Sequence, residues 1–227
     1  MASTTRPTRW AKRSAQSRFD HGTRSARSPS PTRVAGHADH LSPASPPCYA
    51  GFGSTGTLWF PLRHGVRIAT YPDPRGAAKC AELIERRQVT IVRAAPTFLR
   101  GYLRKAEGPQ RRSVRLTITG AEKLPRSLAD AFAEQFGKPV FEGYGLTETS
   151  PVVSVNLPDP EPDNPGDAIQ PSHRPGSVGK LAPGIAAEIR DPEEGTKLSL
   201  HESGMLWLRG PNIFEGYLND PDRTAEV

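Results

Sequence analysis

Residues 114–142 have the sequence VRLTITGAEKLPRSLADAFAEQFGKPVFE, and this stretch decides the fold class. The β-branched run 114–119 predicts a strand, and residues 139–142 predict a second, short strand. Between them, residues 125–136 place their apolar side chains on one helical face, and Gly137 is a residue type that ends helices. A strand, a helix and a strand joined by short connections predict parallel pairing with a right-handed crossover.

The same alternation of helix and strand continues upstream. Residues 77–87 predict a helix because their apolar residues recur at the spacing i, i+3, i+4 and i+7. Residues 89–92 form a β-branched run suited to a buried strand, and residues 96–105 predict a helix that opens on a proline. We therefore predict an α/β fold in which residues 52–156 build a parallel βαβ sheet.

The pattern changes downstream of this α/β part. Residues 157–175 contain six prolines and predict a loop. Residues 176–227 predict a small β-rich subdomain, with strands at 184–190 and 204–209 that belong to a small antiparallel sheet or barrel. A turn at 191–195 lies between these two strands.

The net charge of the chain lies near its N-terminus. The 227 residues include 30 basic and 24 acidic residues, which gives a formal charge of +6. Residues 1–47 contain eight of the basic residues and only two of the acidic residues. The remaining residues are therefore neutral as a set and do not predict a basic binding face. Residues 1–51 lack an apolar period, so we predict a disordered segment rich in Arg, Ser and Pro.

Composition excludes several classes of protein. No stretch approaches the roughly 18 consecutive apolar residues that a membrane-spanning helix needs. The two cysteines, Cys48 and Cys80, do not form a CxxC motif or a Cys/His cluster, which excludes a disulfide framework and a structural zinc site. We expect a cytoplasmic protein.

Two loops follow strands of the predicted parallel sheet, at the edge where such sheets bind ligands. The first is Gly120-Ala121-Glu122-Lys123 and the second is Gly143-Tyr144-Gly145-Leu146-Thr147-Glu148-Thr149. The second has the parts of a nucleotide site. Its glycines permit a close backbone approach, the tyrosine offers a ring for stacking, the first threonine offers a hydroxyl to a phosphate, and the glutamate is an oxygen ligand suited to magnesium.

The string GYGLTETS at 143–150 resembles the signature of the adenylate-forming superfamily, which includes acyl- and aryl-CoA synthetases. Further agreement resembles the branch of long-chain acyl-[acyl-carrier-protein] synthetases, the ligase part of the enzyme that reacylates 2-acylglycerophosphoethanolamine. This agreement lies in the segments FGSTGTLWFPL (52–62), APTFLRGYL (95–103), GAEKLP (120–125), GSVGKLAPGI (176–185) and GMLWLRGPNIFEGYLND (204–220). The resemblance covers roughly residues 52–227 and implies part of an adenylate-forming N-terminal domain.

The resemblance implies roles for the residues of both loops. Tyr144 would stack on adenine, Thr147 would contact the AMP phosphate and Glu148 would hold magnesium. The other residues implied to bind the nucleotide are Gly120, Ala121, Glu122, Gly143 and Gly145, of which the first three would line the adenine and acyl pocket. The implied reaction joins a fatty acid to ATP, giving an acyl-adenylate and pyrophosphate, and then forms a thioester on acyl-carrier protein or coenzyme A. A lysophospholipid is a further implied partner, and association with a membrane would come through domains that this chain lacks.

Some motifs of the family are missing from this sequence, and their absence predicts a lack of activity. The Ser/Thr/Gly-rich phosphate loop that ends in Pro-Lys-Gly is absent, and Ala50 stands where the family has the histidine of an aromatic-His pair. The family's C-terminal lid with its catalytic lysine has no counterpart before Val227. We therefore expect a fragment that is inactive alone, because adenylation depends on positioning and charge stabilisation by those parts.

Other hypotheses remain open at this point. Residues 1–51 fit an out-of-frame translation of GC-rich coding DNA, which we favour because the resemblance fails where this segment ends. A transit peptide and an arm that binds nucleic acid are the alternatives, and we expect nucleic acid to be the less favoured partner. The α/β part fits a non-catalytic module that binds a nucleotide or an acyl group.

Overall fold

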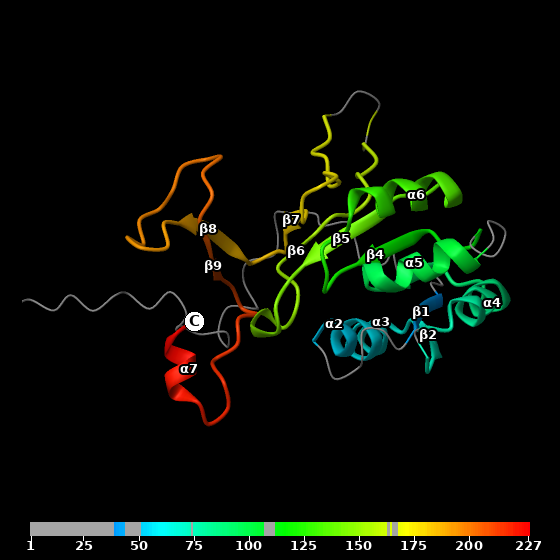
Figure 1. The fold of residues 1–227 in the computed structure, drawn as a ribbon, viewed down its shortest axis with the longest axis horizontal. Coiled ribbons are helices and arrows are strands. Elements are labelled where there is room, and N and C mark those ends of the chain that lie inside the picture. Colours follow the sequence, from blue (N-terminus) through cyan, green and yellow to red (C-terminus); the bar gives the residue numbers. More distant parts are fainter. Residues whose placement is uncertain (1–38, 44–50, 74, 107–111, 163, 165–167) are drawn as a thin grey trace, which may run out of the picture. The chain divides into compact units, whose positions relative to one another are not determined.

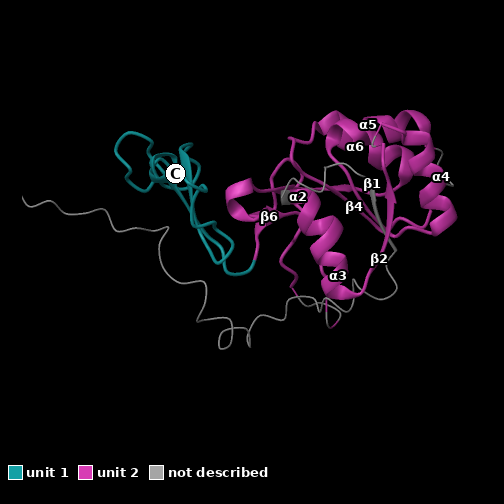
Figure 2. Cartoon of the chain, turned by 90° about the horizontal axis from the view of Figure 1, so that it is seen from below, with its two compact units in different colours: residues 1–26, 183–227 teal, residues 27–182 magenta. Residues whose placement is uncertain are grey.

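The computed structural model describes residues 39–43, 51–73, 75–106, 112–162, 164 and 168–227 (Figure 1). These residues belong to two compact units (Figure 2). One is Arg27–Ala182, and Pro183–Val227 belongs to the other. Within the described ranges, no helix is long and apolar enough to cross a membrane.

The larger unit alternates strands and helices along most of its length. Its elements are β1 (Asp39–Pro43), α2 (Gly51–Ser54), the π-helix η1 (Thr55–Trp59), α3 (Phe60–His64), β2 (Arg67–Tyr71), α4 (Ala77–Arg87), β3 (Ile91–Arg93), α5 (Pro96–Lys105), β4 (Leu116–Thr119), α6 (Arg126–Phe136), β5 (Val140–Tyr144), the 3-10 helix η3 (Thr147–Thr149), β6 (Ser154–Val155) and β7 (Lys180–Leu181). The helices predicted at 77–87, 96–105 and 125–136 are confirmed as α4, α5 and α6. The last of these ends at Gly137, whose φ of 66° is left-handed, as expected for a glycine that ends a helix.

The strands form one sheet with the order β2-β1-β3-β4-β5-β6-β7. Strands β1 to β5 pair in parallel, which confirms the predicted α/β class, and β6 and β7 add antiparallel pairs at one end. Parallel strands need a crossover between them, and α5 and α6 supply it between β3, β4 and β5. The carboxyl ends of these three strands therefore meet at one edge of the sheet.

Helices cover both faces of this sheet (Figure 2). On one face, α4, α5 and α6 bury the main apolar core, in which Ile84, Leu99 and Phe132 are almost fully buried. On the other face lie α2, η1 and α3, which contact the sheet through Thr57 and Arg93. Covering on both faces fits the buried apolar pair Ile91 and Val92 in the central strand β3.

Two boundaries predicted from the sequence need correction. The segment 1–51 was predicted to be disordered, but Asp39–Pro43 forms β1, which pairs with β2 and β3. Main-chain hydrogen bonds to two neighbours define this strand, and they require no apolar period. Residues 1–38 and 44–50 lie outside the described residues. The smaller unit begins at Pro183 rather than at 176, because β7 pairs with β6 in the large sheet.

The described part of the smaller unit contains the predicted antiparallel pair. Strands β8 (Ala186–Arg190) and β9 (Met205–Arg209) pair as expected, and a short helix, α7 (Pro221–Ala225), follows. Asp220 is the N-cap residue of α7, and its side chain accepts a hydrogen bond from the Arg223 backbone N–H at 3.0 Å. This helix was not predicted from the sequence.

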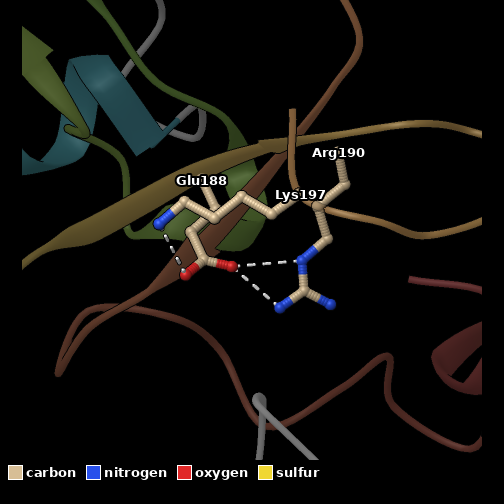
Figure 3. Close-up of polar contacts among 3 residues, drawn as sticks. All are labelled: Glu188, Arg190 and Lys197. Atoms are coloured by element: carbon tan, nitrogen blue, oxygen red, sulfur yellow. Dashed lines mark hydrogen bonds and ion pairs between the residues drawn. The ribbon is translucent and has the colours of Figure 1, made fainter. Parts of the chain in front are cut away.

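A cluster of charged side chains lies on the β8 side of this pair (Figure 3). The Nε and Nη2 atoms of Arg190 donate to Oε2 of Glu188 at 3.1 and 2.8 Å, and Nζ of Lys197 lies 3.7 Å from Oε1. The Arg190 guanidinium also lies over the Trp207 ring, 4.7 Å from its centroid. The hydrogen bonds from Arg190 are the main reason why the pKa of Glu188 is lowered from its ordinary value.

The lowered pKa of Glu188 predicts how this cluster responds to acid. Its stabilising contribution is present above the ordinary pKa of a glutamate and is lost as the pH falls through the lower folded-state pKa. We expect Arg190→Gln to raise the pKa of Glu188 more than Lys197→Gln does, because the arginine donates two hydrogen bonds at short range. Titration of the Glu188 carboxyl carbon by NMR measures both effects, and a larger rise in Lys197→Gln would contradict this assignment.

Candidate functional site

Three loops leave the carboxyl edge of the parallel sheet side by side, after β3, β4 and β5. The second loop approaches the end of β5, because a Cβ atom on Gly120 would lie 3.5 Å from the carbonyl oxygen of Gly143 in β5. The sequence predicted that these loops share one crevice, and this contact supports that prediction. A ligand at this edge therefore meets residues from neighbouring strands.

Two carboxylates tie the loops to one another. Oε2 of Glu122, in the loop after β4, accepts hydrogen bonds from Oγ1 and the backbone N–H of Thr97, at 2.7 and 3.3 Å. Thr97 lies in the first turn of α5, where unpaired N–H groups and the helix dipole favour a negative charge. Oε1 of Glu142, in β5, accepts from the backbone N–H of Leu124 at 3.0 Å. The loop after β4 is thus fixed to both of its neighbours.

The backbone after β5 makes a close approach to itself at Gly145. A Cβ atom on Gly145 would lie 1.6 Å from the carbonyl oxygen of Pro151, so no side chain fits at this position. The Thr149 hydroxyl is buried and lies 2.9 Å from both the backbone nitrogen and the carbonyl oxygen of Leu146. These contacts fold residues 145–151 into a compact turn on the edge of the sheet.

A buried asparagine holds the other side of this turn. The Asn156 side chain donates to the carbonyl oxygens of Glu142, at 3.1 Å, and Ser177, at 2.7 Å. Its Oδ1 accepts from the backbone N–H of Arg174 at 2.8 Å. Asn156 thus joins β5, the strand after the turn, and the segment before β7, and its polar atoms are paired although it is 2 % exposed.

The predicted site residues differ in their surroundings. Tyr144 and Glu148 are half-buried, Thr147 is exposed, and Ala121 adopts a left-handed backbone with φ of 68°. Glu122 was predicted to line the nucleotide pocket, and the structure gives its carboxylate a bond to Thr97 instead; its contact with a ligand stays a prediction. Gly143 and Tyr144 were predicted to lie in the loop, but they are the last two residues of β5 because Gly143 pairs with Val155 and Tyr144 with Ser154 of β6.

Several residues that shape the site were missed from the sequence. Thr97, Glu142 and Asn156 carry no pattern that separates them from ordinary surface residues. Arg93 did carry a signal, because it interrupts the apolar run Ile91-Val92-Arg93-Ala94 at the end of a predicted strand. Phe52, from α2, also belongs to this edge, since its ring lies 3.4 Å from a Cβ position on Gly120.

Few side chains at this edge of the sheet could bind a metal ion. Among the residues that the structure describes, no group of three or more His, Cys, Asp or Glu side chains could hold a metal. Glu148 is half-buried in the turn after β5. A single carboxylate fits magnesium, which commonly binds through one or two carboxylates together with substrate phosphates and water.

Comparison with known proteins adds to this geometry. The model of a family described as "AMP-binding enzyme" matches residues 24–218. This match begins upstream of residue 52, where the resemblance from motifs was predicted to start.

Curated relatives include several acid ligases. A 4-coumarate–CoA ligase of Pinus taeda is 35% identical over 149 residues, which is 64% of this chain and 26% of that protein. A p-hydroxybenzoic acid–AMP ligase of Mycobacterium marinum is 31% identical over 77% of this chain and 23% of that protein, and a long-chain-fatty-acid–CoA ligase of Bacillus subtilis is 29% identical over 80% and 30%. The chain thus spans about a quarter to a third of the length of these relatives.

Solved structures agree with the fold. Apo MatB from Rhodopseudomonas palustris superposes with a TM-score of 0.67 at 28% identity, over 83% of this chain and 35% of that one. The anthranilate CoA ligase AuaEII in complex with anthranoyl-AMP gives a TM-score of 0.69 at 26% identity, over 84% and 35%. These likenesses confirm the predicted adenylate-forming fold for the part of the chain that they cover.

The close approach at Gly145 predicts a large effect of a single methyl group. We expect Gly145→Ala to lower the free energy of unfolding by about 1–3 kcal/mol, because the new Cβ forces the 145–151 turn to shift. Gly101→Ala in α5 is the matched control, since its nearest neighbour, at 3.3 Å, is the side chain of Ala77 and alanine favours a helix. Denaturant unfolding of both variants measures the difference, and equal stabilities would contradict this account of Gly145.

Proposed function

The chain belongs to the AMP-binding enzyme family, and from this premise we propose that it carries the nucleotide and acid sites of an AMP-forming acid–thiol ligase. The proposal is carried by the carboxyl edge of the sheet, where the glycine-lined loops after β4 and β5 meet. Close backbone approach by glycines is what a planar base and a phosphate group require. Family membership covers most of the chain, and the activity of the longer relatives is extended to it as a proposal.

The proposed nucleotide site uses the end of β5 and the turn after it. Tyr144 stacks on adenine, and the exposed Thr147 donates its hydroxyl to the α-phosphate. Gly120, Gly143 and Gly145 belong to the proposed site, and their lack of side chains lets the segments that form it pack closely against one another. In the first half-reaction a carboxylate oxygen of the acid forms a bond to the α-phosphorus, and pyrophosphate leaves with the electron pair of the broken bond.

Glu148 is the residue proposed to hold magnesium together with the phosphate oxygens of ATP. When bound, the ion neutralises phosphate charge as the α-phosphorus is attacked. In the second half-reaction a thiol attacks the acyl carbon, and AMP is the leaving group.

The names of the relatives indicate which acid and which thiol the proposed enzyme uses. Relatives named as ligases of long-chain fatty acids and of aromatic acids support a carboxylic acid substrate. Their names specify coenzyme A as the thiol, so we propose coenzyme A. The acyl-carrier-protein branch, the lysophospholipid partner and a cytoplasmic location with membrane association stay predictions from the sequence.

Binding, rather than turnover, is the suitable measurement for this chain. Its sequence contains no Pro-Lys-Gly phosphate loop, and we predict that it does not complete the reaction alone. A module that binds a nucleotide without turnover would give the same binding results. Release of pyrophosphate from ATP and a fatty acid by this chain would contradict the predicted inactivity and would exclude the non-catalytic module.

Tyr144 provides the sharpest test of the nucleotide site. We expect Tyr144→Ala to weaken AMP binding by about tenfold or more, since stacking of a base on an aromatic ring contributes about 1–3 kcal/mol. Tyr144→Phe keeps the ring and is the matched control, with an affinity close to that of the parent chain. Calorimetric titration with AMP measures both, and an alanine variant that binds as tightly as the phenylalanine variant would overturn the stacking role.

Glu148 is tested through the effect of magnesium on ATP binding. We expect added magnesium to tighten ATP binding in the parent chain and to do so much less in Glu148→Gln, which has a neutral amide in place of the carboxylate. AMP binding without magnesium should be similar in both. Glu134→Gln, at an exposed position on α6, is the control. An undiminished magnesium effect in Glu148→Gln would remove this residue from the metal site.

A further inference from the structure

The loop after β4 contains a backbone conformation that its side chain disfavours. Ala121 has a φ of 68°, in the left-handed region. Glycine enters this region readily because it lacks a Cβ atom, and asparagine and aspartate do so because they can hydrogen-bond to nearby backbone. The methyl group of Ala121 has neither advantage, so its left-handed conformation is disfavoured about tenfold in population. Contacts of the surrounding residues are therefore needed to hold this conformation.

Packing fixes the loop on the N-terminal side of Ala121. Strand β4 ends at Thr119, and Gly120 follows it. A Cβ atom on Gly120 would lie 3.4 Å from the Phe52 ring and 3.5 Å from the carbonyl oxygen of Gly143. A ring from α2 and the backbone of β5 thus bound the point at which the loop leaves the sheet.

A hydrogen-bonded pair fixes the loop on the C-terminal side of Ala121. The next residue is Glu122, whose Oε2 accepts from Oγ1 of Thr97 at 2.7 Å and from the Thr97 backbone N–H at 3.3 Å. Thr97 lies in the first turn of α5, and this helix is anchored in the main core by the fully buried Leu99. The pair therefore ties the residue after Ala121 to a packed helix.

We propose that Thr97 is a positioning residue for the nucleotide site, because its bond to Glu122 holds Ala121 in the left-handed conformation. This inference rests on the proposed function, in which the loop after β4 belongs to the nucleotide site. The backbone of the loop can turn only about its φ and ψ angles, so a change of φ at Ala121 redirects the peptide groups beside it. Thr97 acts through Glu122 and not by contact with the nucleotide.

The size of the effect follows from the fraction of molecules in which the loop is competent to bind. When a ligand binds one of two conformations, its apparent affinity falls in proportion to the population of that conformation. Loss of the Thr97 hydroxyl lets Ala121 leave the left-handed region in part of the molecules. Because Thr97 and Glu122 are both exposed, their bond is of ordinary strength, and its loss should weaken binding by about threefold to tenfold.

Calorimetric titration with AMP tests the role of the Thr97 hydroxyl. We expect Thr97→Val, which keeps the shape of the side chain without the hydroxyl, to weaken AMP binding by about threefold to tenfold. Thr97→Ser keeps the hydroxyl and should bind AMP about as tightly as the parent chain. Glu82→Gln is the control, since it removes an exposed carboxylate on α4 that accepts from Lys79, and it should leave the AMP affinity unchanged.

A glycine at position 121 separates positioning from a general loss of stability. Glycine adopts the left-handed region without a steric penalty, so Ala121→Gly added to Thr97→Val should restore most of the AMP affinity. A structural role of Thr97 alone would not give this recovery, because the glycine replaces none of the contacts that Thr97 makes. Ala131→Gly, at an exposed position on α6, is the matched control and should restore nothing.

The same titrations distinguish failure of this inference from failure of the proposed function. Circular dichroism reports whether each variant is folded, and Thr97→Ala takes the place of Thr97→Val if the valine variant is not. Undiminished AMP binding without the Thr97 hydroxyl would overturn the inference, and so would a loss of binding that Ala121→Gly does not restore. Failure of the folded parent chain to bind AMP would overturn the proposed function, and this inference with it.

Discussion

The parallel pairing of β3, β4 and β5 is the constraint on which the rest of the site depends. It places the carboxyl ends of three strands at one edge, so that loops separated by more than 20 residues in the sequence become neighbours. Crossover helices are required to make such a sheet, and each helix presents unpaired N–H groups where it begins. Glu122 meets this need at the start of α5, and Glu142 does the equivalent for the loop after β4.

The antiparallel strands β6 and β7 extend the sheet beyond β5. Strand β5 would otherwise end the sheet, and β6 covers it by turning back immediately after the proposed nucleotide site. That reversal is sharp enough to exclude a side chain at Gly145. The buried side-chain amide of Asn156 hydrogen-bonds to the backbone of Glu142, Ser177 and Arg174. It thereby links the chain after β6 to β5 and to the segment before β7. A fully paired polar group of this type favours one arrangement of the chain over compact alternatives.

The sequence predicts best those features that depend on local patterns. Helix α6 is predicted to within one residue because proline, an apolar face and a terminal glycine agree. The strand β1 is not predicted, since its identity comes from pairing with β2 and β3. Within the site, the turn after β5 is found from its unusual composition. The residues that hold the turn in place, such as Asn156, act through contacts with distant segments, and a single sequence contains no trace of them.

Arg93 shows how a departure from pattern carries information. A strand between two covered faces favours apolar residues, and a methionine would fill a similar volume at this position without a desolvation cost. The Arg93 side chain donates to Thr57 and lies beside the Phe52 ring, and these contacts link β3 to α2 and η1. Conflicts between local preference and global fold are expected at functional positions, and Arg93 lies next to the ring that contacts Gly120.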